Sequence, residues 1–338
     1  MALLEIENLS VEFPAATGMV RAVDGVSLAL SAGELLGVVG ESGSGKSLTM
    51  LAVMGLLPYP ARARADRLRF KDRDLLTLSN RERRRLAGKS VAMVFQEPTA
   101  SLNPCFTIGF QLVEGLRVHE RMGRRAAWKR AVELLEQVGI RAPEHQMRAY
   151  PHQLSGGMNQ RVMIAMAIAC NPDLLIADEP TTALDVTIQA QILELLLSLQ
   201  RDCGMALILV THNMGVVADT VQRVLVMYGG QVVEERGTAA LFATPQHPYT
   251  AALLAARPEH AELGRLATIP GAPPGLQDRS AGCLFAPRCA YATERSRAAR
   301  PELRDWIGGR VSCHYPLGDA DREARIAADG PVGAEPAP

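Results

Sequence analysis

The chain has 338 residues, of which 48% are hydrophobic, and its 36 basic and 36 acidic side chains give a formal net charge of zero. This length accommodates one large domain and a smaller one, with enough apolar residues for a substantial core. A neutral chain has no overall field to recruit nucleic acid, and no apolar run reaches the roughly 20 residues that cross a bilayer. The acidic, base-free start at residues 1–5 predicts no signal peptide and a cytosolic chain.

Short apolar segments alternate with helical patterns along the chain, which predicts an α/β fold with a largely parallel core. The predicted strands are residues 3–13, 26–30, 35–39, 91–95, 174–179 and 205–210, and predicted helices include residues 126–138 and 162–169. Phe13, near the end of the first strand, is either a stacking partner for adenine or an ordinary core or edge residue. The arginine-rich stretch 62–89 also contains acids, so we interpret it as a solvated face rather than a nucleic-acid or lipid patch.

The strongest motif follows the strand at residues 35–39. It is the octapeptide Gly40, Glu41, Ser42, Gly43, Ser44, Gly45, Lys46, Ser47, which fits the phosphate-binding pattern G-x-x-x-x-G-K-[ST] between a strand and a helix. The glycines let successive backbone N–H groups point at phosphate oxygens. Lys46 is predicted to reach the β- and γ-phosphates of a nucleotide, and the Ser47 hydroxyl to bind Mg²⁺.

Two further segments are weak motifs by themselves but indicate a nucleotide site when they occur with this loop. Gln96 ends the strand at 91–95, where its amide oxygen either binds Mg²⁺ and orients water or caps the next turn. Ser155, Gly156 and Gly157 precede a helical pattern. They form either a second anion-binding helix start or a simple serine N-cap.

Two acids and a histidine end other predicted strands. Asp178 and Glu179 follow the apolar run from residue 174, where a Mg²⁺-site carboxylate is expected. We assign Asp178 to the magnesium ion through water and Glu179 to the attacking water as general base; the alternative is a pair of exposed turn acids. His212 follows the strand at 205–210, and we favour contact with the γ-phosphate over a structural role, because ligands gather at this edge of a parallel sheet.

Together these features resemble the ATP-binding subunit of an ATP-binding-cassette (ABC) transporter. The matching pieces, in family order, are the P-loop at 40–47, the Q-loop Gln96, the signature Leu154, Ser155, Gly156 and Gly157, the acids Asp178 and Glu179, the D-loop Asp185 and the switch His212. The resemblance implies a P-loop NTPase domain with a RecA-like core, an antiparallel β subdomain and a helical subdomain. It also implies that ATP and Mg²⁺ are the cofactors.

The resemblance narrows to the dipeptide/oligopeptide importer branch, which also serves nickel in some members. It rests on residues 101–104, 150–153, 177–187, 247–250 and 269–275. It implies an ABC ATP-binding domain at 1–240 and the branch's C-terminal extension at 241–317. The composition of 318–338 predicts a disordered tail.

The function implied is ATP hydrolysis that powers import of di- or oligopeptides. The alternatives are an importer ATPase for nickel or another small solute, and a soluble ABC ATPase acting on DNA or ribosomes. A single P-loop and signature, with no long heptad run, disfavour the soluble ATPase. The branch's C-terminal segments also argue against an exporter.

The resemblance also implies partners. The signature of one subunit completes the ATP site of another, so we expect a second ATPase subunit, usually a different chain. Two transmembrane permease subunits are expected to dock on the surface around residues 96–111. An extracytoplasmic substrate-binding protein takes part indirectly, and no nucleic acid is expected. The implied location is peripheral, at the cytoplasmic face of the bacterial inner membrane.

Two positions depart from the family pattern. Asn159 stands where a basic residue usually follows the signature, outside the phosphate-contacting positions. The branch's extension often carries four cysteines that bind an iron–sulfur cluster. Here Cys283, Cys289 and Cys313 match three, and Ser296 occupies the fourth position. Three thiolates hold a cluster only with another fourth ligand, such as a serine, a water or His314; otherwise they are plain thiols.

Overall fold

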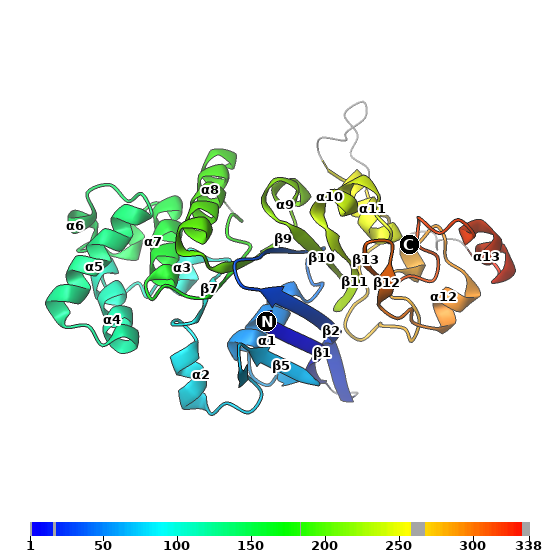
Figure 1. Ribbon diagram of the computed structural model, residues 1–338, viewed down its shortest axis with the longest axis horizontal. Helices are drawn as coiled ribbons and strands as arrows, with labels where there is room; N and C mark the ends of the chain where they lie inside the picture. The colour runs from blue at the N-terminus through cyan, green and yellow to red at the C-terminus, as the bar shows by residue number, and fades with distance from the viewer. Residues whose placement is uncertain (1, 16–17, 183, 258–267, 333–338) are drawn as a thin grey trace. The chain divides into compact units, whose positions relative to one another are not determined.

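The computed structural model describes residues 2–15, 18–182, 184–257 and 268–332 (Figure 1). Contacts divide the chain into two compact units, which are described separately. One contains residues 1–3, 30–34 and 70–210, and we call it the helical unit. The other contains residues 4–29, 35–69 and 211–338, and we call it the P-loop unit. The C-terminal extension therefore belongs to the same compact unit as the P-loop. The predicted boundary between two domains at residue 240 does not reflect this grouping.

A parallel sheet forms the core of the helical unit. In it β8 (Leu174–Asp178) lies between β7 (Val91–Val94) and β9 (Ala206–Thr211), with both neighbours parallel to it. Every residue of these three strands is buried. Such continuous apolar runs are typical of parallel strands covered on both faces, and they confirm the strands predicted near 91–95, 174–179 and 205–210.

Helices make up most of the rest of this unit. They are α2 (Asn80–Leu86), α3 (Pro98–Ser101), α4 (Ile108–Glu120), α5 (Arg124–Gln137), α6 (Pro143–Gln146), the 3₁₀ turn Pro151–Gln153, α7 (Gly156–Ile168) and α8 (Val186–Cys203), with the two-residue strand β6 (Arg73–Asp74). Helix α5 packs against α4, α6 and α7. Its buried residues are Ala127, Ala131, Leu134 and Leu135, which confirms the amphipathic helix predicted at 126–138.

The P-loop unit contains a sheet that the C-terminal extension enlarges. Strand β3 (Leu35–Val39) is parallel to β10 (Arg223–Tyr228), which pairs antiparallel with β11 (Gln231–Gly237). Strand β13 (Gly309–Val311) adds to β11, and β12 (Arg304–Trp306) adds to β13. The extension is thus joined to the nucleotide-binding fold by backbone hydrogen bonds.

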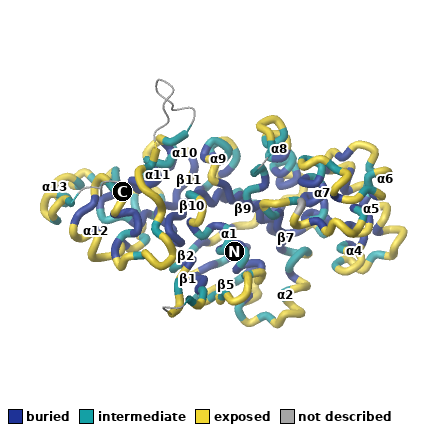
Figure 2. Tube along the Cα trace, turned by 180° about the vertical axis from the view of Figure 1, so that it is seen from behind, coloured by how far each residue is buried: buried dark blue, intermediate teal, exposed yellow. Residues whose placement is uncertain are grey.

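A second sheet contains β1 (Ala2–Ala15), β2 (Gly18–Ser31), β4 (Arg62–Arg64) and β5 (Arg67–Phe70). Strands β1 and β4 are antiparallel, as the family resemblance implied. The helices of this unit are α1 (Lys46–Met54), α9 (Met214–Thr220), α10 (Thr238–Ala243), α11 (Pro248–Ala255), the 3₁₀ turn η3 (Ala286–Arg288), α12 (Glu294–Ala298) and α13 (Arg322–Ala328). Figure 2 shows that strands such as β10 and β11 are largely buried, whereas α13 has no buried residue. In the described ranges no helix is both long and apolar enough to span a membrane.

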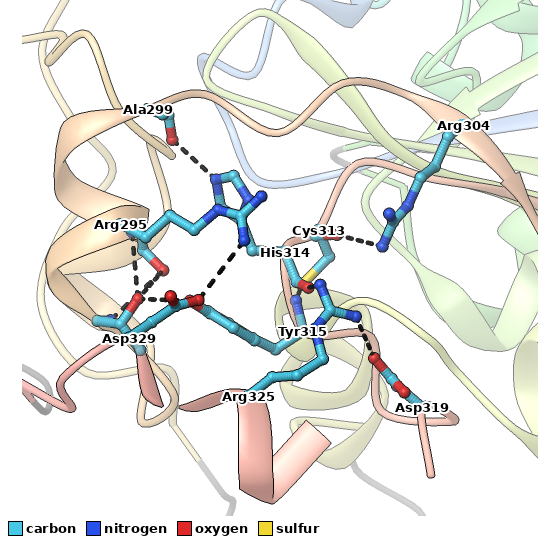
Figure 3. A network of polar contacts seen from close by, with 11 residues as sticks. Arg295, Ala299, Arg304, Cys313, His314, Tyr315, Asp319, Arg325 and Asp329 are labelled. Atoms are coloured by element: carbon cyan, nitrogen blue, oxygen red, sulfur yellow. Dashed lines mark hydrogen bonds and ion pairs between the residues drawn. The ribbon is translucent and has the colours of Figure 1, made fainter. Parts of the chain in front are cut away.

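The tail from Gly318 differs from the disorder expected of its composition. Helix α13 lies in it, and ion pairs and hydrogen bonds hold the helix (Figure 3). Arg325 pairs with Asp319 at 2.6 Å and donates to the His314 carbonyl at 3.1 Å. The buried Tyr315 donates its hydroxyl to Asp329 at 2.6 Å. Specific polar contacts, rather than apolar burial, order the tail as far as residue 332; residues 333–338 lie outside the described part.

Candidate nucleotide-binding site

The P-loop residues form a compact turn in the P-loop unit. Gly40, Gly43 and Gly45 have φ values of 152°, 76° and 93°, a region that favours glycine. Gly45 precedes α1, whose first residue is Lys46. Lys46 is 4% exposed, and its ammonium donates to the carbonyls of Gly40 at 2.8 Å and Glu41 at 2.9 Å. The loop therefore positions a buried cation at a helix N-terminus, the arrangement that binds phosphate.

The acids and the glutamine come together in the helical unit. Strands β7 and β8 are parallel neighbours, so Gln96 and Glu179 follow the same ends of adjacent strands. The Gln96 amide donates to the Glu179 carboxylate at 3.3 Å, and the Thr182 hydroxyl donates to it at 2.8 Å. Asp178, the last residue of β8, is 5% exposed.

The backbone of Glu179 is strained. Its φ is 45°, a left-handed value that a residue with a side chain seldom adopts. The Glu179 N–H donates to the Val210 carbonyl at 2.8 Å, which fixes this conformation. Non-glycine residues held in such conformations cluster at functional sites. Strain at the residue assigned as general base is therefore a second, independent indication of function.

The signature and the D-loop begin two helices of the helical unit. Ser155 caps α7, and its side chain accepts from the Met158 N–H at 3.3 Å. The exposed Ser155 and Gly156 lie at a thirteen-residue helix's positive end. Asp185, assigned to the D-loop, caps α8 by accepting from the Ile188 N–H at 3.0 Å. Both sequence interpretations of the serine, cap and anion-binding start, are compatible with this geometry.

The remaining predicted residues lie at strand ends or are buried. Phe13 is half-buried near the end of β1. His212 follows β9 and is exposed. Asn159 is 3% exposed and donates to the Pro151 carbonyl at 3.0 Å, so it supports the signature from inside the helical unit.

The three C-terminal cysteines line one small cavity with Ser296 and His314, but they do not form a metal centre. The cavity measures about 20 Å³, room for about one water. Among the described residues, no three His, Cys, Asp or Glu side chains are arranged to hold a metal ion. Burial raises the pKa of Cys289 to about 12 and also raises the pKa values of Cys283 and Cys313, which favours neutral thiols. This geometry does not fit an iron–sulfur cluster.

Sequence reasoning missed three residues that contact predicted site residues. Thr182 holds Glu179, while Tyr249 and Arg288 contact Glu41 of the P-loop. Thr182 lies in a segment that the resemblance covered, so its spacing from Glu179 offered a signal. The contacts of Tyr249 and Arg288 with Glu41 join residues far apart in the sequence, so no local sequence pattern predicts them.

Comparison with protein families and solved structures agrees with the geometry. The family model "ABC transporter" matches residues 23–182, and the model "Oligopeptide/dipeptide transporter, C-terminal region" matches residues 233–295. A dimeric ATP-binding cassette solved in a post-hydrolysis state with ADP and Pi aligns with a TM-score of 0.60 and 28% identity, covering 70% of this chain and 98% of that chain. CbiO1 of Clostridium perfringens aligns with a TM-score of 0.58 and 28% identity, covering 72% of this chain and 91% of that chain.

Curated relatives match over almost the whole length. The dipeptide transport ATP-binding protein DppD of Escherichia coli (strain K12) is 56% identical over 95% of this chain and 99% of its own. The oligopeptide transport ATP-binding protein OppD of Bacillus subtilis (strain 168) is 50% identical over 89% of this chain and 85% of its own. With the P-loop, the strained glutamate and the C-terminal extension in place, the chain belongs to the ABC transporter family, in the branch of the dipeptide and oligopeptide transport ATP-binding proteins.

Proposed function

We propose that this chain binds and hydrolyses ATP to power import of di- or oligopeptides through a membrane complex. The observation that carries the proposal is Glu179, held at the end of β8 with a left-handed backbone and two donors on its carboxylate. The extension, shared with peptide-transport relatives, supports a peptide substrate over nickel or another solute. We retain 1–240 as the ATP-binding domain and 241–317 as the extension.

The predicted site residues take complementary roles in this proposal. Lys46 and the P-loop N–H groups bind the phosphates, and the Ser47 hydroxyl and Gln96 bind Mg²⁺. Asp178 holds the magnesium ion through water. Glu179 accepts a proton from the attacking water. Mg²⁺ supplies neutralisation of the phosphate charge.

His212 contacts the γ-phosphate in this scheme, and Phe13 stacks on the adenine. Support for His212 is its exposed position directly after a buried strand. Phe13 is half-buried at the end of β1, which leaves part of its ring available.

A second ATPase subunit, a different but related chain, completes the site. The hydroxyl of the exposed Ser155 and the N–H groups at the start of α7 donate to a γ-phosphate bound by that partner, and the partner's signature does the same for this chain. A solved relative described as a dimeric cassette supports the pairing. ATP then favours the closed pair, and hydrolysis removes that bias.

Two permease subunits dock on the helical unit at the cytoplasmic face of the bacterial inner membrane. A groove of about 820 Å³ between α4 and α5 supports this assignment; its lining includes Phe110, Arg117 and Trp128. Phe106 stacks on Phe110 with ring centroids 4.6 Å apart, and both rings remain more than 40% exposed. Exposed aromatic side chains beside a cation are suited to a partner helix. The permeases and an external binding protein select the substrate.

The chemistry is tested with Glu179→Gln in the purified chain and in its complex. This variant removes the base but keeps the size and polarity of the side chain. It is expected to bind MgATP as the wild type does and to lose at least about a hundredfold in hydrolysis, as for removal of a general base. Lys46→Ala serves as the control that loses binding. Hydrolysis at the wild-type rate by Glu179→Gln rejects Glu179 as the base.

The partners are tested with the same variant, which is expected to accumulate in the ATP-bound, closed state. Tagged Glu179→Gln chain is captured from detergent-solubilised membranes with MgATP, and co-purifying proteins are identified by mass spectrometry. We expect two multi-span permeases and a second ATPase. Recovery of ribosomal or nucleic-acid proteins without a permease contradicts the transport function while leaving the ATPase chemistry intact.

A further inference from the structure

Glu41, the second residue of the P-loop, is held through its amide, its carbonyl and its side chain. The Glu41 N–H donates to the Tyr249 hydroxyl at 2.8 Å. Its carbonyl accepts from the Lys46 ammonium at 2.9 Å and from the Ser44 N–H at 3.2 Å. Its carboxylate accepts two hydrogen bonds from the Arg288 guanidinium, at 2.8 and 3.1 Å. Two of these three attachments come from the C-terminal extension.

Arg288 is itself fixed in place. It is 7% exposed, and its Nε donates to the Pro270 carbonyl at 2.7 Å, while another nitrogen donates to the Tyr228 hydroxyl at 3.1 Å. Burial alone would lower the pKa of Arg288, but hydrogen bonds with Glu41 and Tyr228 raise it above its ordinary value. A two-pronged arginine–carboxylate contact of this kind sets direction as well as distance.

An aromatic cluster supports Arg288 and Tyr249. The Tyr249 ring lies 4.6 Å from Tyr228 and 5.4 Å from Phe285, measured between centroids. Tyr249 is fully buried and lies in α11, two residues after the buried N-cap His247. Phe285 precedes the η3 turn that ends with Arg288. Both contacts to Glu41 therefore come from rigid, packed elements, which is what precise positioning of a site requires.

We propose that Arg288 and Tyr249 are positioning residues for ATP, which act through Glu41 to fix the shape of the P-loop. The extension is then a working part of the nucleotide site. It sets the Glu41 carbonyl, which is hydrogen-bonded to Lys46, before the nucleotide arrives. Preorganisation of this kind saves the free energy of ordering the loop on binding. The inference rests on the assignment of the P-loop to the ATP phosphates.

The test is equilibrium binding of MgATP to the purified full-length chain. The variants are Arg288→Ala, Glu41→Gln and the double variant. Arg325→Ala is the matched control, because Arg325 pairs with Asp319 in the same extension without touching the P-loop. We expect Arg288→Ala to weaken binding by roughly tenfold, the scale of a lost charged hydrogen bond. In the Glu41→Gln background the same change should have little further effect, because Glu41 transmits it.

Several results would overturn the inference. One is an unchanged MgATP affinity in Arg288→Ala, and another is a loss no larger than in the Arg325→Ala control. A third is additive losses in the double variant, because a diffuse effect of the Arg288 charge on the phosphates does not pass through Glu41. If Arg288→Ala does not fold, Tyr249→Phe is tested instead, because it removes only the hydroxyl. This variant should weaken MgATP binding severalfold, and an unchanged affinity would equally overturn the inference. Normal binding by Lys46→Ala would instead show that the phosphate assignment itself failed.

Discussion

His247 gives the stability of the C-terminal extension a defined pH dependence. Its side chain is 1% exposed, and Nδ1 accepts the Tyr249 N–H at 3.0 Å, which caps α11. A proton on Nδ1 would remove this acceptor. Burial lowers the pKa of His247 to about 3, opposed in part by a hydrogen bond with the Ser312 backbone. The folded state therefore favours the neutral imidazole.

The sign and size of the effect follow from linkage. Between pH 3 and about 6.5 the unfolded chain binds a proton at this residue and the folded chain does not, so stability falls as the pH falls. The contribution of His247 is fully present above pH 6.5. From pH 7 to pH 5 it should decrease by about 2 kcal/mol, since each pH unit below 6.5 costs about 1.4 kcal/mol.

The assay is urea unfolding at pH 7 and pH 5, comparing the wild type with His247→Asn. Asparagine caps helices well and does not titrate. A Trp128→Phe background leaves Trp306 as the sole tryptophan; its indole donates to Gln246 at 3.0 Å, so its fluorescence reports on this region. Comparing the two proteins cancels the pH dependence that other titratable groups contribute. One such group is Glu234, whose pKa is raised by burial, so that it stabilises the fold as the pH falls, opposite to His247. An equal pH 7 to pH 5 loss in wild type and variant refutes the reasoning.

Two further predictions concern the P-loop and the cysteine cavity. Gly40→Ala is expected to abolish MgATP binding and to lower the free energy of unfolding by about 1–3 kcal/mol, because the new Cβ would lie 2.1 Å from the Met227 carbonyl. Gly43→Ala is the control: φ is also positive but nothing lies within 4 Å, so equal binding losses in both variants would contradict the clash. Anaerobically purified chain is expected to contain neither iron nor acid-labile sulfide, and stoichiometric amounts of both would show that the cavity opens around a cluster.

Local sequence motifs predicted most of the strands and helices and the main residues of the nucleotide site. A P-loop and an acid-ended strand are short, contiguous patterns whose geometry follows from a few backbone conformations, and Lys46 and Glu179 were found that way. One residue has a role that its local pattern states only in part. Asp185, identified as the D-loop, also caps α8 through its carboxylate.

The contacts of the extension could not be predicted because they are distant in sequence. Tyr249 lies 208 residues from Glu41, and Arg288 lies 247 residues from it. Each residue by itself is an ordinary tyrosine or arginine. The disorder predicted for the tail differs from the structure for a related reason. Composition reports apolar content, whereas Asp329 and Arg325 order the tail through specific hydrogen-bond partners.

The strand β13 has a consequence for solubility. It covers the backbone edge of β11, and Arg310 pairs with Glu235 to hold it there. The outermost strand, β12, is only three residues long and begins with the exposed Arg304 and Asp305. Short, charged edges resist pairing with another chain, whereas long apolar edges invite aggregation. By covering the edge of β11, whose residues 232–236 are all buried, the extension keeps the cassette from joining its neighbours edge to edge.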